Sequence, residues 1–398
     1  MRRGAWIIIG AQVVGAACIL TTSFDRYDTS IAGVDAAVPD APPPADAAVP
    51  DTRVDADWCP SLVPLPTGAD DGTEEKDYVL AVRGLRLERL PEAGPPEPTV
   101  GFNVDHTCTC PGPESCVPTA SATGNRCDDP GGRDNAAIGV FTAFSTAAPE
   151  AFQPGFVRSQ IAAGRYTFLL KLQKYNGTPN DSQIVANFLA SSGVEGVQTA
   201  DGGPLRPPTF DGTDVWTVDP VSLLSGSDAI GKDCATDLKA CAAEYRDVAA
   251  YVTDGVLVAH IDAPLRIGLT VGTFNIDVKG GVLVGKLTRS GDSFSLAGDY
   301  AGRLQIGHLL QALTFFREPV LNEFLCPHTP LYKGLKKSLC GALDLRGRSL
   351  DDGKGLPCDA LSTSLSFEAH PARLGHVWQP PGDAPPCKDA SAELDRCD

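Results

Sequence analysis

The sequence is poor in features that would each point to a familiar class of protein. Its apolar stretch near the start, Trp6 to Ala17, is about twelve residues long, whereas a membrane-spanning helix takes about 20 residues. Cations are outnumbered, with 33 Lys and Arg against 50 Asp and Glu and a formal net charge of -17. Such a surface repels phosphate backbones, so the composition argues against a nucleic-acid partner.

Short catalytic motifs are also missing. Gly-x-Ser-x-Gly is absent, and the six histidines form neither His-Glu-x-x-His nor a close His/Cys pair. Segments 226–232 and 280–286 fit Gly-x-x-x-x-Gly-Lys, but Asp233 and Leu287 follow where a phosphate-binding loop needs Ser or Thr. We therefore predict no nucleotide partner. A pair of carboxylates leaves no motif, so a hydrolase remains an alternative.

The N-terminus is typical of an exported protein. Arg2 and Arg3 precede the apolar stretch, which predicts a signal peptide over residues 1–17. Its end, Gly15-Ala16-Ala17-Cys18, resembles a bacterial lipobox, which implies a lipid anchor on Cys18. Ordinary cleavage and secretion is the alternative, since Gly15 stands where a lipobox usually has leucine. If the cell has an outer membrane, Ile19 after Cys18 implies sorting to it.

An acidic linker follows, over residues 18–57. Residues 25–57 hold eight Asp, two Arg and no Lys among many Ala and Pro. Linkers of this composition are extended because they are Pro-rich and self-repelling. We predict a spacer with an upper reach of roughly 100 Å, although a disordered remnant has the same composition.

Cysteine is abundant, with 13 residues. Without Cys18 an even set remains, which in an exported chain predicts up to six disulfides. Within the crowded segment 108–127, two internal pairings stay open: 108–116 with 110–127, or 108–127 with 110–116. Cys387 and Cys397 are expected to pin the tail, and one option is that they pair with each other. The predicted disulfide set is Cys59, Cys108, Cys110, Cys116, Cys127, Cys234, Cys241, Cys326, Cys340, Cys358, Cys387 and Cys397.

Short strands separated by turn residues dominate the remainder. They predict a mainly β, disulfide-stapled fold, a β-sandwich or jelly-roll, with few short helices. We expect two β-rich lobes, 58–235 and 236–378, before a Pro-rich tail over 379–398. Helices are expected over 233–248, 304–316 and 331–343.

Lipobox, Asp/Ala/Pro linker and β-rich Cys-containing domain together resemble the uncharacterised exported lipoproteins of myxobacteria. Gly131-Gly132-Arg133-Asp134-Asn135-Ala136 and Cys358-Asp359-Ala360-Leu361-Ser362 are similar to recurring segments of such proteins. The resemblance implies a place in the cell envelope and carries no assigned activity.

Oxygen ligands gather beside the crowded cysteines, at Asp105, Asp128, Asp129, Asp134 and Asn135. Calcium takes six to eight oxygen ligands, so this stretch predicts a candidate calcium site. A weaker cluster is Asp211 to Asp214. Asp, Asn and Gly also form turns without any metal, which is the alternative.

Taken together, the sequence predicts a cell-envelope lipoprotein that is a non-catalytic binding or structural module. It would contact the membrane through its lipid and recognise polysaccharide, calcium or an envelope protein. The alternative is a surface hydrolase that cleaves polysaccharide with paired carboxylates.

Overall fold

The fold is known from a computed structural model. The described residues are 63–86, 100–110, 112–120, 122, 127–129, 131–140, 154–196, 207–269, 272–318, 322–379, 387 and 395–397. All belong to the unit Arg53–Asp398. The predicted signal peptide, the predicted lipid-attachment residue Cys18, the predicted linker and Cys59 lie outside the described residues, as does most of the tail. Within the described part, no helix is long and apolar enough to span a bilayer.

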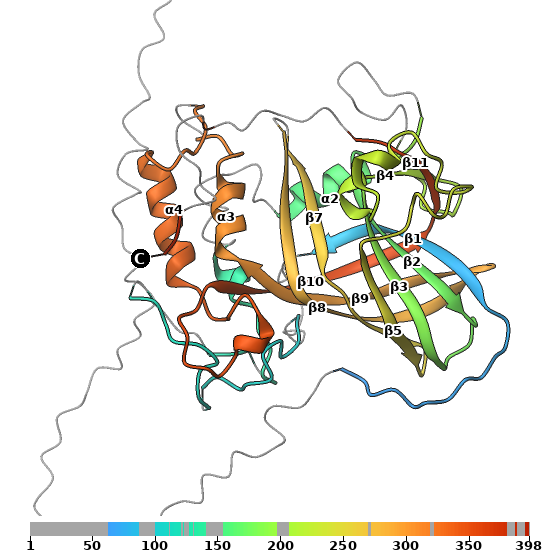
Figure 1. Cartoon of the computed structure of the whole chain (residues 1–398), viewed down its shortest axis with the longest axis horizontal. Coiled ribbons are helices and arrows are strands. Elements are labelled where there is room, and N and C mark those ends of the chain that lie inside the picture. Colours follow the sequence, from blue (N-terminus) through green and yellow to red (C-terminus); the bar gives the residue numbers. More distant parts are fainter. Residues whose placement is uncertain are drawn as a thin grey trace, which may run out of the picture. The chain divides into compact units, whose positions relative to one another are not determined.

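The centre of this unit is a closed antiparallel barrel of eight strands (Figure 1). The strand order is β6-β5-β3-β2-β1-β10-β9-β8, and the pairing of β6 with β8 closes the ring, while β7 pairs with the start of β8. The bounds are β1 Lys76–Arg86, β2 Thr167–Tyr175, β3 Asp181–Ser191, β5 Tyr245–Thr253, β6 Val256–His260, β7 Ala263–Leu269, β8 Gly272–Ser290, β9 Ser293–Gln305 and β10 Ala360–Pro371.

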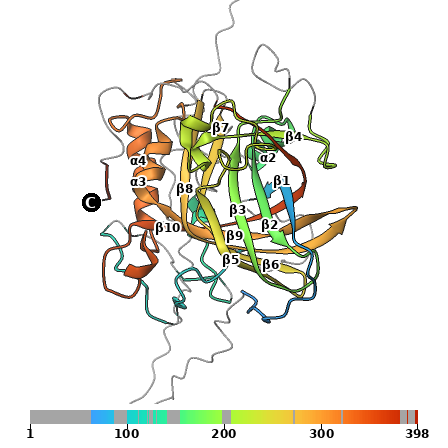
Figure 2. The ribbon, with the colours of Figure 1, turned by 45° about the vertical axis from the view of Figure 1, so that its right-hand side comes forward.

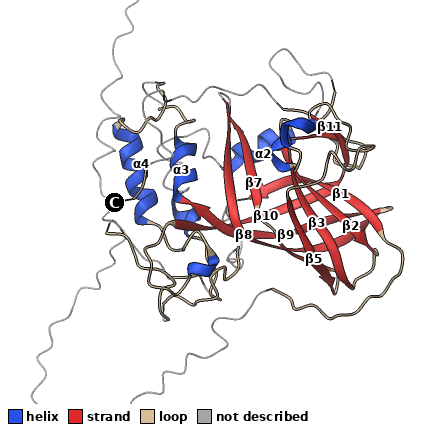
Figure 3. Cartoon of the chain, in the orientation of Figure 1, coloured by secondary structure: helices blue, strands red, loops and turns tan. Residues whose placement is uncertain are grey.

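Outside the barrel lie a two-stranded parallel sheet and a few helices (Figure 3). The sheet joins β4 (Val215–Val218) to β11 (Arg373–Val377), and α2 (Pro154–Ala162) packs against β1. At one end, α3 (Ile306–Leu313) packs against β8 and β9, and α4 (Pro330–Gly341) packs against α3 (Figure 2). Three single 3-10 turns cover Pro220–Ser222, Gly226–Ala229 and Ser349–Asp351.

Alternating apolar residues fill the barrel. Phe168, Leu170, Phe188 and Tyr300 are buried and line an internal cavity of only about 20 Å³. Tight turns connect the strands, as at Asp254-Gly255 between β5 and β6, where both residues have positive φ. The barrel is therefore packed by its own side chains.

The mainly β prediction is confirmed, but the predicted sandwich or jelly-roll is wrong, because the sheet closes on itself. Alternation of apolar residues is the same in a sandwich and in a small barrel, so the sequence pattern cannot distinguish them. The predicted lobes, 58–235 and 236–378, share this one sheet: β1, β2 and β3 precede residue 235, and β5 to β10 follow it.

Two of the three expected helices are present, as α3 and α4. Thr329 caps α4 by accepting a hydrogen bond from the Tyr332 N–H, and Pro330 occupies the first turn. The helix expected over 233–248 is wrong. A turn closed by the Cys234–Cys241 disulfide stands there, followed by β5.

Disulfides join segments far apart in the chain. The described pairs are Cys110–Cys127, Cys116–Cys358, Cys234–Cys241, Cys326–Cys387 and Cys340–Cys397, and Cys108 is also disulfide-bonded. The 110–127 pair is confirmed. The predicted pairs 108–116 and 110–116 are both wrong, because Cys116 bonds to Cys358. A 387–397 pair is also wrong, because Cys387 bonds to Cys326 and Cys397 bonds to Cys340 in α4. Several disulfides are compatible with an exported protein.

Candidate functional site

Two features could carry chemistry, and the first is a buried acidic cluster. Asp105, Asp128 and Asp134 line a cavity of about 10 Å³ together with Glu114 and Asp344. The Asp134 carboxylate accepts a hydrogen bond from the Val104 N–H at 2.7 Å. The structure thus brings together three of the five predicted calcium ligands and adds residues that the prediction missed.

Burial and mutual repulsion raise the pKa values in this cluster. Burial, then the charges of Asp105, Asp344 and Asp128, raises the pKa of Asp134 to about 9. Burial also raises the pKa of Asp344 to about 7 and that of Asp128 to about 6. Around neutral pH the cluster therefore holds protons that reduce its negative charge.

The other two predicted ligands do not line this cavity. The Asp129 backbone forms a turn with Arg133, and the Asn135 side-chain oxygen accepts a hydrogen bond from the Ser364 N–H at 3.1 Å. Among the described residues, no three His, Cys, Asp or Glu side chains are placed to hold a metal ion. Calcium binding by the acidic cluster stays a prediction.

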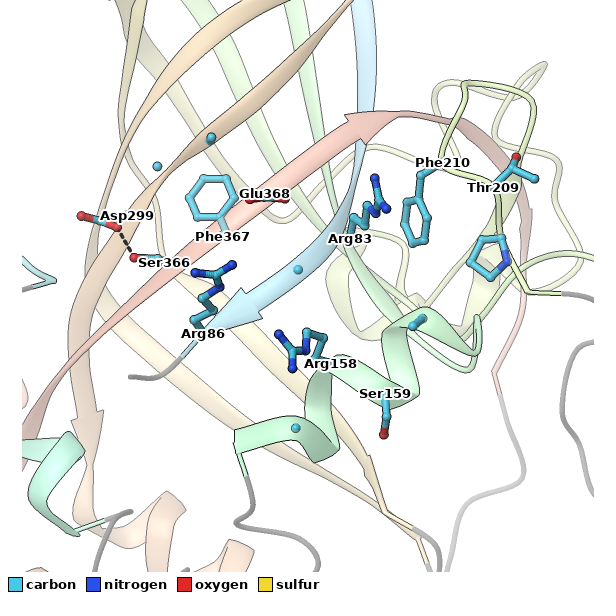
Figure 4. A pocket seen from close by; sticks show the side chains of 16 residues that line it. Arg83, Arg86, Arg158, Ser159, Thr209, Phe210, Asp299, Ser366, Phe367 and Glu368 are labelled. Atoms are coloured by element: carbon cyan, nitrogen blue, oxygen red, sulfur yellow. Dashed lines mark hydrogen bonds between the residues drawn. The ribbon is translucent and has the colours of Figure 1, made fainter. Parts of the chain in front are cut away.

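The second feature is a groove of about 790 Å³ on the outer face of the barrel (Figure 4). Strands β1, β10 and β9 provide its floor, α2 provides one wall and residues 208–210 form part of its rim. Outward-pointing positions alternate with interior ones, so Ser366 and Glu368 face the groove on either side of the buried Phe367.

Small residues leave room for the groove. Gly84 and Ala297 line its floor, and Gly155 and Ala162 lie on the facing wall of α2. A Cβ added at Gly84 or Gly155 would meet no atom within 4 Å. A register shift in β1 between Val82 and Gly84 bends the strand beside the groove. The groove therefore exists because small residues line it and because the barrel strands fix the backbone around it.

Three arginines supply positive charge to the groove. Arg83 and Arg86 come from β1 and Arg158 from α2, and all three side chains are exposed (Figure 4). Within the described part of the chain, none of the three guanidinium groups takes part in an ion pair or a hydrogen bond. Together with burial, the charge of Arg83 lowers the pKa of His370. The guanidinium groups are therefore available to a ligand.

Two carboxylates share the groove. Asp299 on β9 lies opposite Ser366 on β10, whose hydroxyl donates a hydrogen bond to it at 2.5 Å. Glu368, two residues farther along β10, is exposed. The floor therefore holds acids beside the arginines.

Hydrogen bonds and ring packing hold the rim at residues 208–210 in place. The buried Asp214 carboxylate accepts hydrogen bonds from the Thr209 and Phe210 N–H groups at 2.8 and 2.6 Å. Phe210 has a φ of 55°, which is rare for an aromatic residue, and its ring packs against Trp216. Strained residues of this kind concentrate at functional sites.

Turn formation accounts for the weaker acidic cluster. The Asp211 carboxylate accepts hydrogen bonds from the Thr213 hydroxyl and N–H, which lowers the pKa of Asp211 to about 2. Both Asp211 and Asp214 are thus engaged by their own loop, which agrees with the turn alternative.

Sequence reasoning missed the groove altogether. Its arginines come from two elements separated by many residues, and none belongs to a motif. Asp344 was missed for the same reason, since only folding brings it beside Asp134.

Comparison of the chain with protein-family models, with curated proteins and with solved structures finds no match.

Proposed function

We propose that this chain is an exported binding module, tethered to the cell envelope by a lipid on Cys18, and that its groove binds a glycan. Support for the location comes from the signal segment, the resemblance to a lipobox and the disulfides. The extended linker would hold the barrel away from the membrane. In this role the protein binds its ligand without catalysing a reaction.

One observation carries the binding proposal. The groove of about 790 Å³ lies on closed-barrel strands and presents guanidinium groups without partners among the described residues. Sites on strands are held more precisely than sites on loops. The groove therefore needs little reorganisation to receive a ligand, which favours binding.

A second candidate rests on Asp299 and Glu368. They stand on neighbouring strands of the same groove, with Asp299 opposite Ser366 and Glu368 opposite Ala297. Glycosidases use two carboxyl groups about 5 to 9 Å apart. Asp299 and Glu368 are therefore the candidate catalytic pair if the protein is a polysaccharide hydrolase.

The test is a pull-down of the purified mature chain on insoluble polysaccharides and on isolated cell envelopes, with and without calcium. The supernatant is assayed for released sugar. Retention without release supports the binding module, and release that disappears in Asp299→Asn and Glu368→Gln supports the hydrolase. No retention on any glycan would overturn the binding proposal.

A further inference from the structure

We infer that the groove selects an acidic polysaccharide, one whose repeating sugars carry carboxylates, and that Arg83, Arg86 and Arg158 bind those carboxylates. The inference rests on the proposed glycan-binding function and names its substrate class.

Charge is the first argument. The chain carries a net charge of -17, yet three guanidinium groups without partners among the described residues meet in this groove. Arginine stays protonated at every physiological pH, and its planar fork matches a carboxylate with two parallel hydrogen bonds. Asp299 and Glu368 share the groove, so three arginines against two carboxylates leave it a formal charge of +1 in a chain whose net charge is -17. This local excess of positive charge favours a ligand with anionic groups.

Spacing is the second argument. Arg83 and Arg86 are three residues apart on β1, so their Cα atoms are separated by at most about 10 Å. The register shift between Val82 and Gly84 lets both side chains face outward. Arg158 approaches from α2 on the facing wall (Figure 4). A guanidinium fork binds a carboxylate with two parallel hydrogen bonds, and guanidinium groups on different elements can each bind a different carboxylate. Three separate guanidinium groups therefore suit a ligand that repeats its negative charge along a chain.

The closed sheet is the third argument. Strands β1, β9 and β10 each have a hydrogen-bonded neighbour on both sides. An extended peptide binds most simply by adding a strand to a free edge, and these strands offer none. The groove must therefore read its ligand through side chains, as the arginines allow.

The experiment compares one polymer in two charge states. Dissociation constants are measured by calorimetry for polygalacturonate and for its methyl ester, which keeps the sugars and removes the charge. Inorganic polyphosphate serves as a second polyanion. The mature full chain is compared with Arg83→Gln/Arg158→Gln and with Arg246→Gln. Arg246 is an exposed arginine on β5, three strands away from β1.

We expect polygalacturonate to bind at least tenfold more tightly than its methyl ester. The dissociation constant of the double variant should be about tenfold higher, which is about 1.4 kcal/mol, since each exposed ion pair is individually weak. Arg246→Gln should stay within twofold of the parent. Higher salt should weaken binding of polygalacturonate and leave binding of its uncharged methyl ester unchanged.

Other outcomes separate the two proposals. Equal binding of both polymers, untouched by the double variant, would overturn the acidic preference and leave glycan binding intact. Tighter binding of polyphosphate than of polygalacturonate would overturn the carboxylate assignment. Binding of neither sugar polymer, and of no glycan in the pull-down, would remove both proposals.

Discussion

Replacing Asp344 by asparagine should change how stability depends on pH. The half-buried Asp344 accepts hydrogen bonds from the Ser362 N–H and hydroxyl, and burial of its carboxyl group raises its pKa to about 7 from 3.8. The folded state therefore holds this proton more tightly than the unfolded chain does. Its contribution to stability is full below about pH 4 and is lost as pH rises to about 7.

The magnitude follows from the shift. About three pKa units correspond to about 4 kcal/mol at 1.36 kcal/mol per unit, taken as an upper limit. The substituted asparagine cannot ionise, and its amide oxygen can still accept a hydrogen bond from Ser362. The wild type should lose up to about 4 kcal/mol more than Asp344→Asn between pH 4 and pH 7.

Unfolding in guanidinium chloride at pH 4, 5, 6, 7 and 8, with the disulfides intact, measures this difference. The matched control is Asp254→Asn, which changes an exposed acid at the β5–β6 turn and keeps a residue that tolerates positive φ. Parallel curves for the wild type and Asp344→Asn would refute the assignment of a proton to this site.

Three further outcomes are expected. If the acidic cluster binds calcium, the ion should raise the melting temperature of the wild type but not of Asp134→Asn, and more at pH 8 than at pH 5; a calcium-independent melting temperature would remove that idea. Gly298→Ala should destabilise the barrel by about 1–3 kcal/mol or more in denaturant unfolding, because its new Cβ would lie 2.1 Å from the Val284 carbonyl oxygen; unchanged stability would contradict the packing. Arg303→Met should cost about 3–5 kcal/mol in the same assay, since it leaves Asp352 without its buried ion-pair partner; Arg303→Met with Asp352→Leu should recover part of that loss.

The sequence alone determined the local elements where pattern and boundary residues agree. Short apolar runs between turn residues predicted a mainly β chain, and apolar spacing predicted α3 and α4. The helix expected over 233–248 failed, because a disulfide between Cys234 and Cys241 holds a turn in place. Part of the acidic cluster was also visible, since Asp128 and Asp134 are close in sequence.

Only the tertiary structure decided how those elements combine. Closure of the barrel depends on the pairing of β6 with β8, and Cys116 meets Cys358 only after the chain has folded around it. The same is true of Asp344 beside Asp134 and of Arg158 facing β1. Local alternation and spacing depend on neighbouring residues, so a single sequence displays them. Sheet closure, disulfide partners and the groove depend on contacts between distant segments, whose free energies no short pattern contains.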